Sequence, residues 1–382
     1  MTADSAPVLV PVEGASARSR FLKLTRTLYR ADPCWVEPLA IERRQHLDPR
    51  HNPYFAHAEV AYWLAERNGE TVGRISAQID RHENEGDSNG IGHFGFLDAI
   101  DDRGVFALLL GAAEDWLRRR GMRRITGPFT LSINDESGLL IDGFDTPPFV
   151  MMGHAPAYAA GHVAGLGYER EKDLIAYLYR LDQSLPPSLA AFLAKISQSA
   201  SLTFRSLDWR NFDAEIARVV AIFNDAWAGN WGFVPFDRDG VRHLAKALRM
   251  LIGPDDVAIG EIDGLPVAMA VGLPNINEAI ADLDGRLLPF GWAKLLWRLK
   301  IGTLKSARMP LMGVSRKYHN TPAGAALAIG VIDRLRQFHR SKGTLRAELS
   351  WILEDNRPMR RMIEAFGAVA YKTYRVFGKD LT

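Results

Sequence analysis

The stretch 311–367 holds the residues whose types and spacing best suit the binding of an anion. A loop of small and polar residues, 315–321, leads into Pro322 and a helical pattern of apolar residues. Proline fits the first turn of a helix because the amide it lacks would have no partner there. Asn320 or Thr321 is placed to cap this helix. Since exposed amides at a helix N-terminus favour phosphate, the sequence predicts an anion-binding loop.

Three titratable residues are candidates for accepting a proton. Glu348 lies on a predicted strand, where alternation directs Glu348 and Ser350 to the same face. Glu136 and His154 lie in a long segment without a helix or strand pattern, 132–156, and such segments are usually functional or disordered. Histidine is the side chain that titrates nearest neutral pH. A glutamate paired with a cation and a histidine held by a hydrogen bond are the alternatives, and both stay open.

Apolar runs on either side of turn residues predict the strands that position these side chains. Asn68-Gly69 and Asp263-Gly264 each separate two such runs, which is the pattern of a β-hairpin with a tight turn. Helical spacing occurs in both halves, including a helix from about 239 to 251. The best linker is the polar, proline-containing stretch 183–188.

Spacing in the two halves indicates an internal repeat. Asn134 follows Gly121 at the same spacing at which Asn356 follows Gly343. Each pair brackets an apolar strand pattern and precedes a helical pattern, a glycine and a Tyr-rich strand. The sequence therefore predicts two copies of one α/β unit, the first with the segment 132–156 inserted. Chance coincidence of the spacings is the alternative.

Length and composition are those of a globular protein of two or three domains, with 382 residues, 47% hydrophobic and 24% charged. A net charge of +2 does not suggest a nucleic-acid-binding protein. The single cysteine, Cys34, excludes an internal disulfide and a cysteine-based metal site. Aspartates between 135 and 145 lack the spacing of a calcium loop, so no metal is expected. Without a signal peptide or an apolar run of about 20 residues, we expect a cytoplasmic protein.

On these motifs the chain resembles the GNAT superfamily of acyl-CoA N-acyltransferases, as a tandem pair. The phosphate loop of that family, Arg/Gln-x-x-Gly-x-Gly/Ala, corresponds to residues 321–326. Asn356, followed by a helix and Phe366-Gly367, corresponds to the closing motif of the family. The region from Gly127-Pro128 to Lys172-Asp173 also resembles a bacterial subfamily of long GNAT-like proteins that includes ceramide synthases.

Three departures from the family pattern affect the expected chemistry. Thr321 stands where Arg or Gln is usual, and Ile363 stands where many members have a tyrosine that protonates the leaving thiolate. The first half has no glycine-rich phosphate loop at 97–106. The resemblance therefore implies that the second half binds CoA, and it leaves the proton donor unassigned.

The resemblance implies the α/β fold class, with two tandem GNAT-like domains, each a mixed, mostly antiparallel sheet flanked by helices. The implied N-terminal domain covers residues 1–183 and contains the inserted loop 132–156. A linker and connecting helix, 184–201, lead to a C-terminal acyl-CoA-binding domain, 202–382. That domain contains a basic, apolar insertion at 276–309.

The resemblance also implies roles for individual residues. The strand 312–315 would splay beside the pantetheine arm, with amides that donate to the developing oxyanion. The residues expected to bind acyl-CoA are Met312, Val314, Ser315, Arg316, Lys317, Tyr318, Asn320, Thr321, Gly324 and Asn356. The expected proton acceptors are Glu348, His154 and Glu136, and the residues expected to bind the acceptor substrate are Asn134, Tyr158 and Ser350.

The insertion indicates the kind of substrate. Residues 286–308 contain six basic and no acidic residues among Trp and Leu, a composition typical of a helix on an anionic bilayer. A buried helix with a basic edge is the alternative. The residues expected to share an apolar face are Leu288, Trp292, Leu295, Leu296 and Leu299, with Trp297 nearly opposite.

Together these features predict an acyl-CoA-dependent N-acyltransferase that acts on the amine of a lipid-like acceptor, with a sphingoid base as the sharpest candidate. We expect acyl-CoA as co-substrate, no nucleic-acid partner, and a peripheral location on the inner face of the membrane. The alternatives are tRNA-dependent aminoacyl transfer, which some tandem GNAT proteins perform, and non-catalytic binding of acyl-CoA or lipid.

Overall fold

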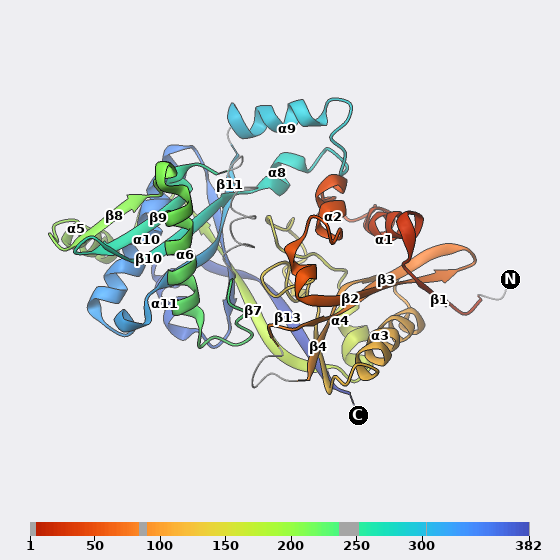
Figure 1. The fold of residues 1–382 in the computed structure, drawn as a ribbon. Coiled ribbons are helices and arrows are strands. Elements are labelled where there is room, and N and C mark those ends of the chain that lie inside the picture. The colour runs from red at the N-terminus through yellow and green to blue at the C-terminus, as the bar shows by residue number, and fades with distance from the viewer. Residues whose placement is uncertain (1–4, 84–89, 237–251, 303, 382) are drawn as a thin grey trace. The chain divides into compact units, whose positions relative to one another are not determined.

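The computed structural model describes residues 5–83, 90–236, 252–302 and 304–381 (Figure 1). The chain forms two compact units. Unit 1 contains residues 1–174, 280–288 and 372–382, and unit 2 contains residues 175–279 and 289–371. The helix predicted at about 239–251 lies outside the described residues.

Unit 1 is built on a mostly antiparallel sheet in the order β1-β2-β3-β4-β5-β13, with β6 paired to β13. The pair β4–β5 is parallel. In chain order its elements are β1 (Val8–Pro11), α1 (Gly14–Leu28), α2 (Ala40–His46), the 3-10 helix η1 (Pro53–Ala56), β2 (Ala58–Arg67), β3 (Glu70–Asp80), β4 (Ile91–Ala99), α3 (Arg103–Arg118), β5 (Arg124–Gly127), β6 (Leu139–Asp142), α4 (Ala159–Gly165) and the start of β7 (Glu169–Arg180).

Unit 2 has a sheet in the order β7-β12-β11-β10-β9-β8, in which β11 and β12 are parallel. Its elements are α5 (Pro187–Ile196), β8 (Leu202–Ser206), η2 (Trp209–Asn211), α6 (Phe212–Trp227), η3 (Pro254–Asp256), β9 (Val257–Ile262), β10 (Leu265–Pro274), α8 (Ile276–Ile280), α9 (Gly291–Lys300), β11 (Ser306–Val314), η4 (Arg316–Tyr318), α10 (Pro322–Ser341), β12 (Arg346–Leu353), α11 (Arg357–Ala365) and β13 (Val369–Asp380).

The two halves of the chain repeat one order of elements, as the spacing predicted. The hairpin β2–β3, then β4, α3, β5, α4 and β7, corresponds to the hairpin β9–β10, then β11, α10, β12, α11 and β13. Both hairpin predictions are confirmed. Asn68 and Gly69 have φ of 53° and 80°, and Asp263 and Gly264 have φ of 49° and 77°, the left-handed pair that a tight turn between twisted strands needs.

The last strand of each repeat ends in the other unit. β7 passes into unit 2 after Leu174, and β13 passes into unit 1 after Tyr371. In unit 1, β13 pairs with both β5 and β6, while in unit 2 the end of β7 lies beside β12. The domains expected from sequence, 1–183 and 202–382, follow the repeats, whereas the compact units exchange these strands.

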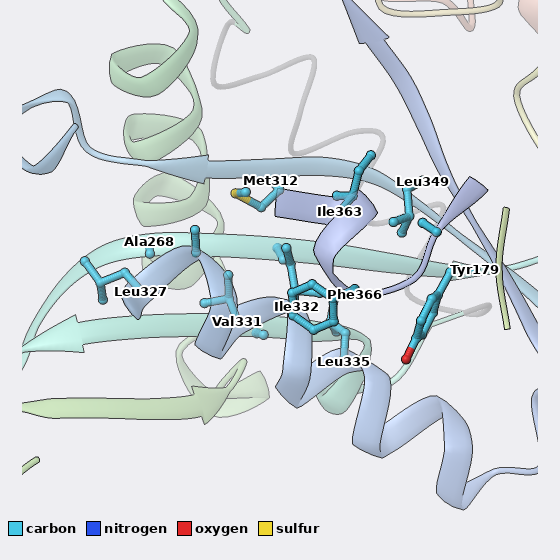
Figure 2. Packing of buried hydrophobic residues seen from close by; sticks show 14 of the residues in the cluster. Tyr179, Ala268, Met312, Leu327, Val331, Ile332, Leu335, Leu349, Ile363 and Phe366 are labelled. Atoms are coloured by element: carbon cyan, nitrogen blue, oxygen red, sulfur yellow. The ribbon is translucent and has the colours of Figure 1, made fainter. Parts of the chain in front are cut away.

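Helix α10 and the sheet enclose the core of unit 2. The residues of α10 at helical spacing, Leu327, Val331 and Leu335, are buried. Figure 2 shows the cluster, in which Leu327, Val331, Ile332 and Leu335 meet Met312 of β11, Leu349 of β12 and Ile363 and Phe366 of the α11 region. This core fixes β11 and β12 against the first two-thirds of α10.

Two sequence expectations need correction. β11 begins at Ser306, so the insertion after β10 ends at 305 rather than 309, and Arg308 belongs to the sheet. The segment 132–156 is not wholly irregular, because Leu139–Asp142 forms β6 and pairs with β13. None of the helices in the described residues is long and apolar enough to cross a membrane.

Candidate functional site

Strands β11 and β12 of unit 2 separate along their length. In the described residues their parallel ladder ends at Met309 and Leu349, while β11 continues against β10 to Val314. The next residue, Ser315, donates its amide to a carbonyl of β10 at 2.8 Å. Because successive amides of a strand point to opposite sides, those of Met312 and Val314 point away from β10, toward the opening beside β12. The amides of Met312 and Val314 suit the predicted role of donors to the developing oxyanion, whereas the Ser315 amide is already bonded within the sheet.

The loop after β11 ends at a capped helix N-terminus. Thr321, and not Asn320, is the N-cap, since its hydroxyl accepts the amide of Gly324 at 3.0 Å. Asn320 has φ of 58° and turns the chain before Pro322, which occupies the first turn. A Cβ on Gly324 would lie 2.0 Å from the carbonyl oxygen of Tyr318. Only glycine therefore allows the loop to close onto α10.

Several backbone amides that were expected to bind phosphate instead donate hydrogen bonds within this loop. Tyr318 donates to the Ser315 carbonyl at 2.9 Å, and Thr321 donates to the Tyr318 carbonyl at 3.3 Å. The Gly324 amide is taken by the Thr321 hydroxyl. The attraction that remains for an anion comes from the positive end of the long helix α10 and from the neighbouring cations.

Arg316 and Lys317 supply those cations. The guanidinium Nε of Arg316 donates to Asp225 at 3.1 Å, and its amide donates to the same carboxylate at 2.8 Å. Burial opposes ionisation of Asp225, but these bonds outweigh it and lower the pKa of the carboxyl. An exposed pair of this kind contributes only about 0–1 kcal/mol, so Arg316 can turn to an incoming phosphate. The Lys317 Nζ lies 4.8 Å from the centre of the Tyr318 ring.

Glu348 is completely buried on β12. It accepts hydrogen bonds from the hydroxyls of Ser350 and Tyr371, and Nε of Arg308 lies 3.7 Å from its carboxylate. Arg308 also donates to the Ser350 hydroxyl at 2.9 Å. Glu348 and Ser350 thus share one face, as alternation predicted. The glutamate is both paired with a cation and bonded to two hydroxyls that can carry a proton.

Two residues of the closing motif have structural roles. The Asn356 side chain accepts the Met359 amide at 3.2 Å and caps α11. Ile363 is buried in the core of unit 2 and offers no proton. A contact between Asn356 and CoA stays a prediction.

Unit 1 has the same strand arrangement with a different helix end. The parallel ladder of β4 and β5 ends at His93 and Thr126. Helix α3 is capped by Asp102, whose carboxylate accepts the amides of Gly104 at 2.7 Å and Val105 at 3.2 Å. This carboxylate, which also accepts a hydrogen bond from Arg67 at 2.6 Å, already takes up the amides at the positive end of α3, so they are not available to a phosphate.

The titratable residues of the inserted segment lie in unit 1. The His154 side chain is 1% exposed, and its Nε2 lies 2.7 Å from Asp32. Asp32 fixes the ring, and Nδ1 is buried with no partner for its lone pair among the described residues. Glu136, by contrast, is bonded to Arg43, which neutralises its charge.

The other residues predicted to bind the acceptor make local bonds. Tyr158 donates to the carbonyl of Ala99 at 2.7 Å, and burial, aided by Asp101 and Asp98, raises its pKa to about 12. The Asn134 amide donates to the Ser132 hydroxyl at 3.1 Å. Their contact with substrate stays a prediction.

Similarity to known proteins extends over the whole chain. A sequence model of the Acetyltransferase (GNAT) family matches residues 24–137. "Bacterial ceramide synthase" from Caulobacter vibrioides (strain NA1000 / CB15N) is 47% identical over 377 residues, 98% of this chain and 97% of that protein. The chain belongs to the GNAT family. Protein YghO from Escherichia coli (strain K12) is 45% identical over 94% of this chain and 92% of its own length.

A solved GNAT structure has the same tandem arrangement. The "Tandem GNAT protein from the clavulanic acid biosynthesis pathway (without AcCoA)" aligns with a TM-score of 0.58 at 13% identity, covering 98% of this chain and 99% of that one. At that identity the likeness shows the fold alone, and it confirms the predicted fold class. The stretch that matches the GNAT family model lies in unit 1, the unit whose helix end is acidic.

The residues that sequence reasoning missed include four that contact the predicted proton acceptors: Arg308, Tyr371, Asp32 and Arg43. Arg308 was assigned to the basic insertion, but it is 4% exposed and stands opposite Glu348 in the parallel register. The position of Arg308 within an apolar strand pattern was the feature of the sequence that could have predicted its burial. Asp32 lies 122 residues from His154, and no local pattern connects them.

One group of potential metal ligands occurs in the described part of unit 1. Ligand atoms of His57, Asp80 and His82 lie within 4.8 Å of one another. The His57 ring bonds to Asp80 at 2.9 Å and stacks on the His82 ring at 4.1 Å. These two contacts account for the arrangement without a metal.

Proposed function

We propose that this GNAT protein is an acyl-CoA-dependent N-acyltransferase that acylates the amine of a long-chain, lipid-like acceptor. The observation that carries the proposal is the 47% identity, over 98% of the chain, to a protein named bacterial ceramide synthase. On that likeness the acceptor is a sphingoid base and the product is a ceramide. Acyl-CoA is the only co-substrate that the proposal requires.

The proposed reaction forms a C–N bond and breaks a C–S bond. The amine nitrogen attacks the thioester carbonyl, the CoA thiolate leaves, and the nitrogen loses a proton. We assign the amides of Met312 and Val314 to the developing oxyanion, because they point to the open side of β11. Arg316, Lys317 and the N-terminus of α10 are assigned to the phosphates of CoA.

Glu348 is the proposed proton acceptor. The hydroxyls of Ser350 and Tyr371, which donate to its carboxylate, offer a path by which a proton reaches the buried group. His154 is the alternative acceptor, because Asp32 holds its ring and leaves Nδ1 open. Glu136 is the weakest of the three candidates, because Arg43 holds it.

An apolar pocket in unit 2 suits the acyl chain. It encloses about 450 Å³ when its open mouth is included. Its walls include Met309 and Leu349, the last pair of the β11–β12 ladder, together with Ile332 and Leu335 of α10. Leu335→Trp should fill this space and shift the preference from long-chain toward short-chain acyl-CoA. An unchanged ratio of kcat/KM between the two would tell against the pocket.

The acceptor determines where such an enzyme works. A long-chain amine is held in a bilayer by its apolar chain, since each buried methylene contributes about 0.8 kcal/mol. We therefore propose that the protein acts at the inner face of the membrane as a peripheral protein.

The decisive experiment supplies purified protein with long-chain acyl-CoA and sphinganine. Release of free CoA thiol together with an N-acyl product in mass spectra supports the proposal. Tight CoA binding without turnover on any long-chain amine indicates a non-catalytic binder, and turnover only with aminoacyl-tRNA indicates the other alternative.

Glu348→Gln separates a catalytic role from a structural one. Loss of a general base lowers kcat by about 10²–10⁴-fold while the Kd for CoA is kept. Arg308→Gln is the matched control, because it breaks the same buried pair and removes no proton acceptor. If both variants lose stability and activity in parallel, Glu348 is structural, and His154→Ala then tests the alternative base.

A further inference from the structure

The segment 290–301 holds large apolar side chains in solvent. Five of them are between 52% and 79% exposed: Phe290, Trp292, Leu296, Trp297 and Ile301. Helix α9, the cyan helix of Figure 1, lies within this segment and has no buried residue. Exposed apolar side chains that are gathered along one segment usually mark an interaction surface, whereas scattered ones do not.

The direction of these side chains follows from how α9 is attached to unit 2. Arg298 donates to the carbonyl of Ala279 at 2.6 Å, and Leu295 and Leu299 are half-buried beside it. At about 100° per residue, these three residues form the inner face. Trp297 lies on the opposite, outer face, whereas Trp292 and Leu296 lie at the edge of the inner face beside Leu299 and are still 53% and 52% exposed. Trp297, expected opposite the apolar face, is therefore part of the exposed surface, and Leu295 and Leu299 are not.

Charge identifies what this surface meets. Lys294 and Lys300 of α9 are exposed, and residues 286–308 contain no Asp or Glu. Tryptophan and lysine are the residues that sit at the boundary between head groups and acyl chains. A second copy of the same surface would set lysines against lysines. An anionic bilayer satisfies both the apolar and the cationic groups.

We propose that the segment 290–301 is a membrane-docking surface, with α9 lying flat in the head-group layer of an anionic bilayer. Trp292, Leu296 and Trp297 enter the apolar boundary while Lys294 and Lys300 stay among the phosphates. This proposal rests on the proposed function, because the lipid-like acceptor is what gives the protein a reason to bind a bilayer. The docking itself does not depend on catalysis.

Vesicle flotation tests the proposal with the full chain. The wild type should float with vesicles of phosphatidylcholine and phosphatidylglycerol, and far less with phosphatidylcholine alone. Trp292→Ser/Leu296→Ser/Trp297→Ser should lower partitioning by at least about tenfold. Lys294→Ala/Lys300→Ala should lower partitioning onto the anionic vesicles by about 5-fold per lysine. The difference between this variant and the wild type should vanish at about 1 M salt, where the Debye length is about 3 Å.

A matched control removes apolar side chains of similar exposure elsewhere. Leu265 and Val369 are 61% and 66% exposed, and Leu265→Ser/Val369→Ser should float as the wild type does. Failure of the wild type to float, or undiminished flotation of the triple variant, overturns the proposal. So does conversion of a dimer to a monomer by the triple variant in sedimentation velocity, since a second copy would then cover the surface.

Activity separates this inference from the proposed function. With acceptor dispersed in detergent, the triple variant should keep the turnover of the wild type and lose it only with acceptor in vesicles. Equal loss in both forms overturns a docking role. Absence of turnover in the wild type, with flotation intact, counts against the acyltransferase and leaves the docking surface standing.

Discussion

Replacing Thr321 by aspartate should weaken CoA binding while the stability of helix α10 changes little. The Thr321 hydroxyl accepts the Gly324 amide at 3.0 Å, and an aspartate at this position accepts the same amide and caps a helix at least as well. Its charge adds about 0.3–1 kcal/mol by interaction with the helix dipole. Aspartate loses the hydrogen bond that the Thr321 hydroxyl donates to the Tyr318 carbonyl at 2.7 Å, which costs about 0.5–1.5 kcal/mol. The two effects offset each other, so the free energy of unfolding should change by no more than about 1 kcal/mol.

The same carboxylate should repel the pyrophosphate of CoA. At about 5 Å, it and one phosphate charge repel by roughly 1 kcal/mol in bulk water and by roughly 3 kcal/mol at an effective dielectric constant of 20. These energies raise the Kd for CoA by about 5-fold and about 150-fold, respectively. Calorimetric titration with CoA and denaturant unfolding measure the two quantities, and Thr321→Ser is the control that keeps a neutral cap.

A large effect on the Kd beside a small effect on stability gives this test its strength. A variant that bound CoA weakly because it was poorly folded would also unfold much more easily. A variant that is as stable as the wild type and binds CoA with the wild-type Kd would refute the assignment of phosphate to the N-terminus of α10.

Three further perturbations test the site and the fold. Gly324→Ala puts a Cβ 2.0 Å from a backbone carbonyl and should raise the Kd for CoA at least about tenfold. By contrast, Gly330→Ala meets only a phenyl ring and should lower Tm with the Kd unchanged. Burial lowers the pKa of His339 to about 4 and raises that of Asp256 to about 6. In His339→Gln, Asp256 is the member of this pair that still titrates. Because the folded state binds the Asp256 proton more tightly than the unfolded state does, the free energy of unfolding of this variant should rise by roughly 3 kcal/mol as the pH falls from about 6 to about 4. In Asp256→Asn, His339 is the member that still titrates, and the unfolded state binds its proton more tightly. The free energy of unfolding of this variant should therefore fall by a similar amount as the pH falls from about 6.5 to about 4, as measured by denaturant titrations. Deletion of residues 372–382 removes three buried apolar side chains of β13, each worth about 1.5–3 kcal/mol, and the pairing of β13 with β5 and β6. Unit 1 should therefore be digested rapidly in limited proteolysis.

Local patterns in the sequence predicted local structure well. Asn68-Gly69 and Asp263-Gly264 formed the two hairpin turns, because left-handed backbone at a turn needs residues of these types. The helix opened by Pro322, with Thr321 as its cap, formed for equally local reasons. The family resemblance then supplied the tandem fold, which no single pattern contains.

Contacts between residues distant in sequence could not be predicted in this way. The pairing of β13 with β5 joins Phe377 to Gly127, and nothing in either strand pattern names its partner. Arg308 looked like part of a basic surface, because its burial beside Glu348 depends on the register of two parallel strands. The bond between His154 and Asp32 likewise depends on where a long segment folds.

The equivalent helices of the two repeats explain why a family match alone does not locate CoA. α3 and α10 begin after equivalent strands, but Asp102 caps α3 with a charge and Thr321 caps α10 with a hydroxyl. The family model matches residues 24–137, in the repeat with the charged cap. One side chain at a helix end decides whether an outside anion is attracted. By that criterion the second repeat is the one suited to CoA, and the charge at position 321 is what should be varied to test it.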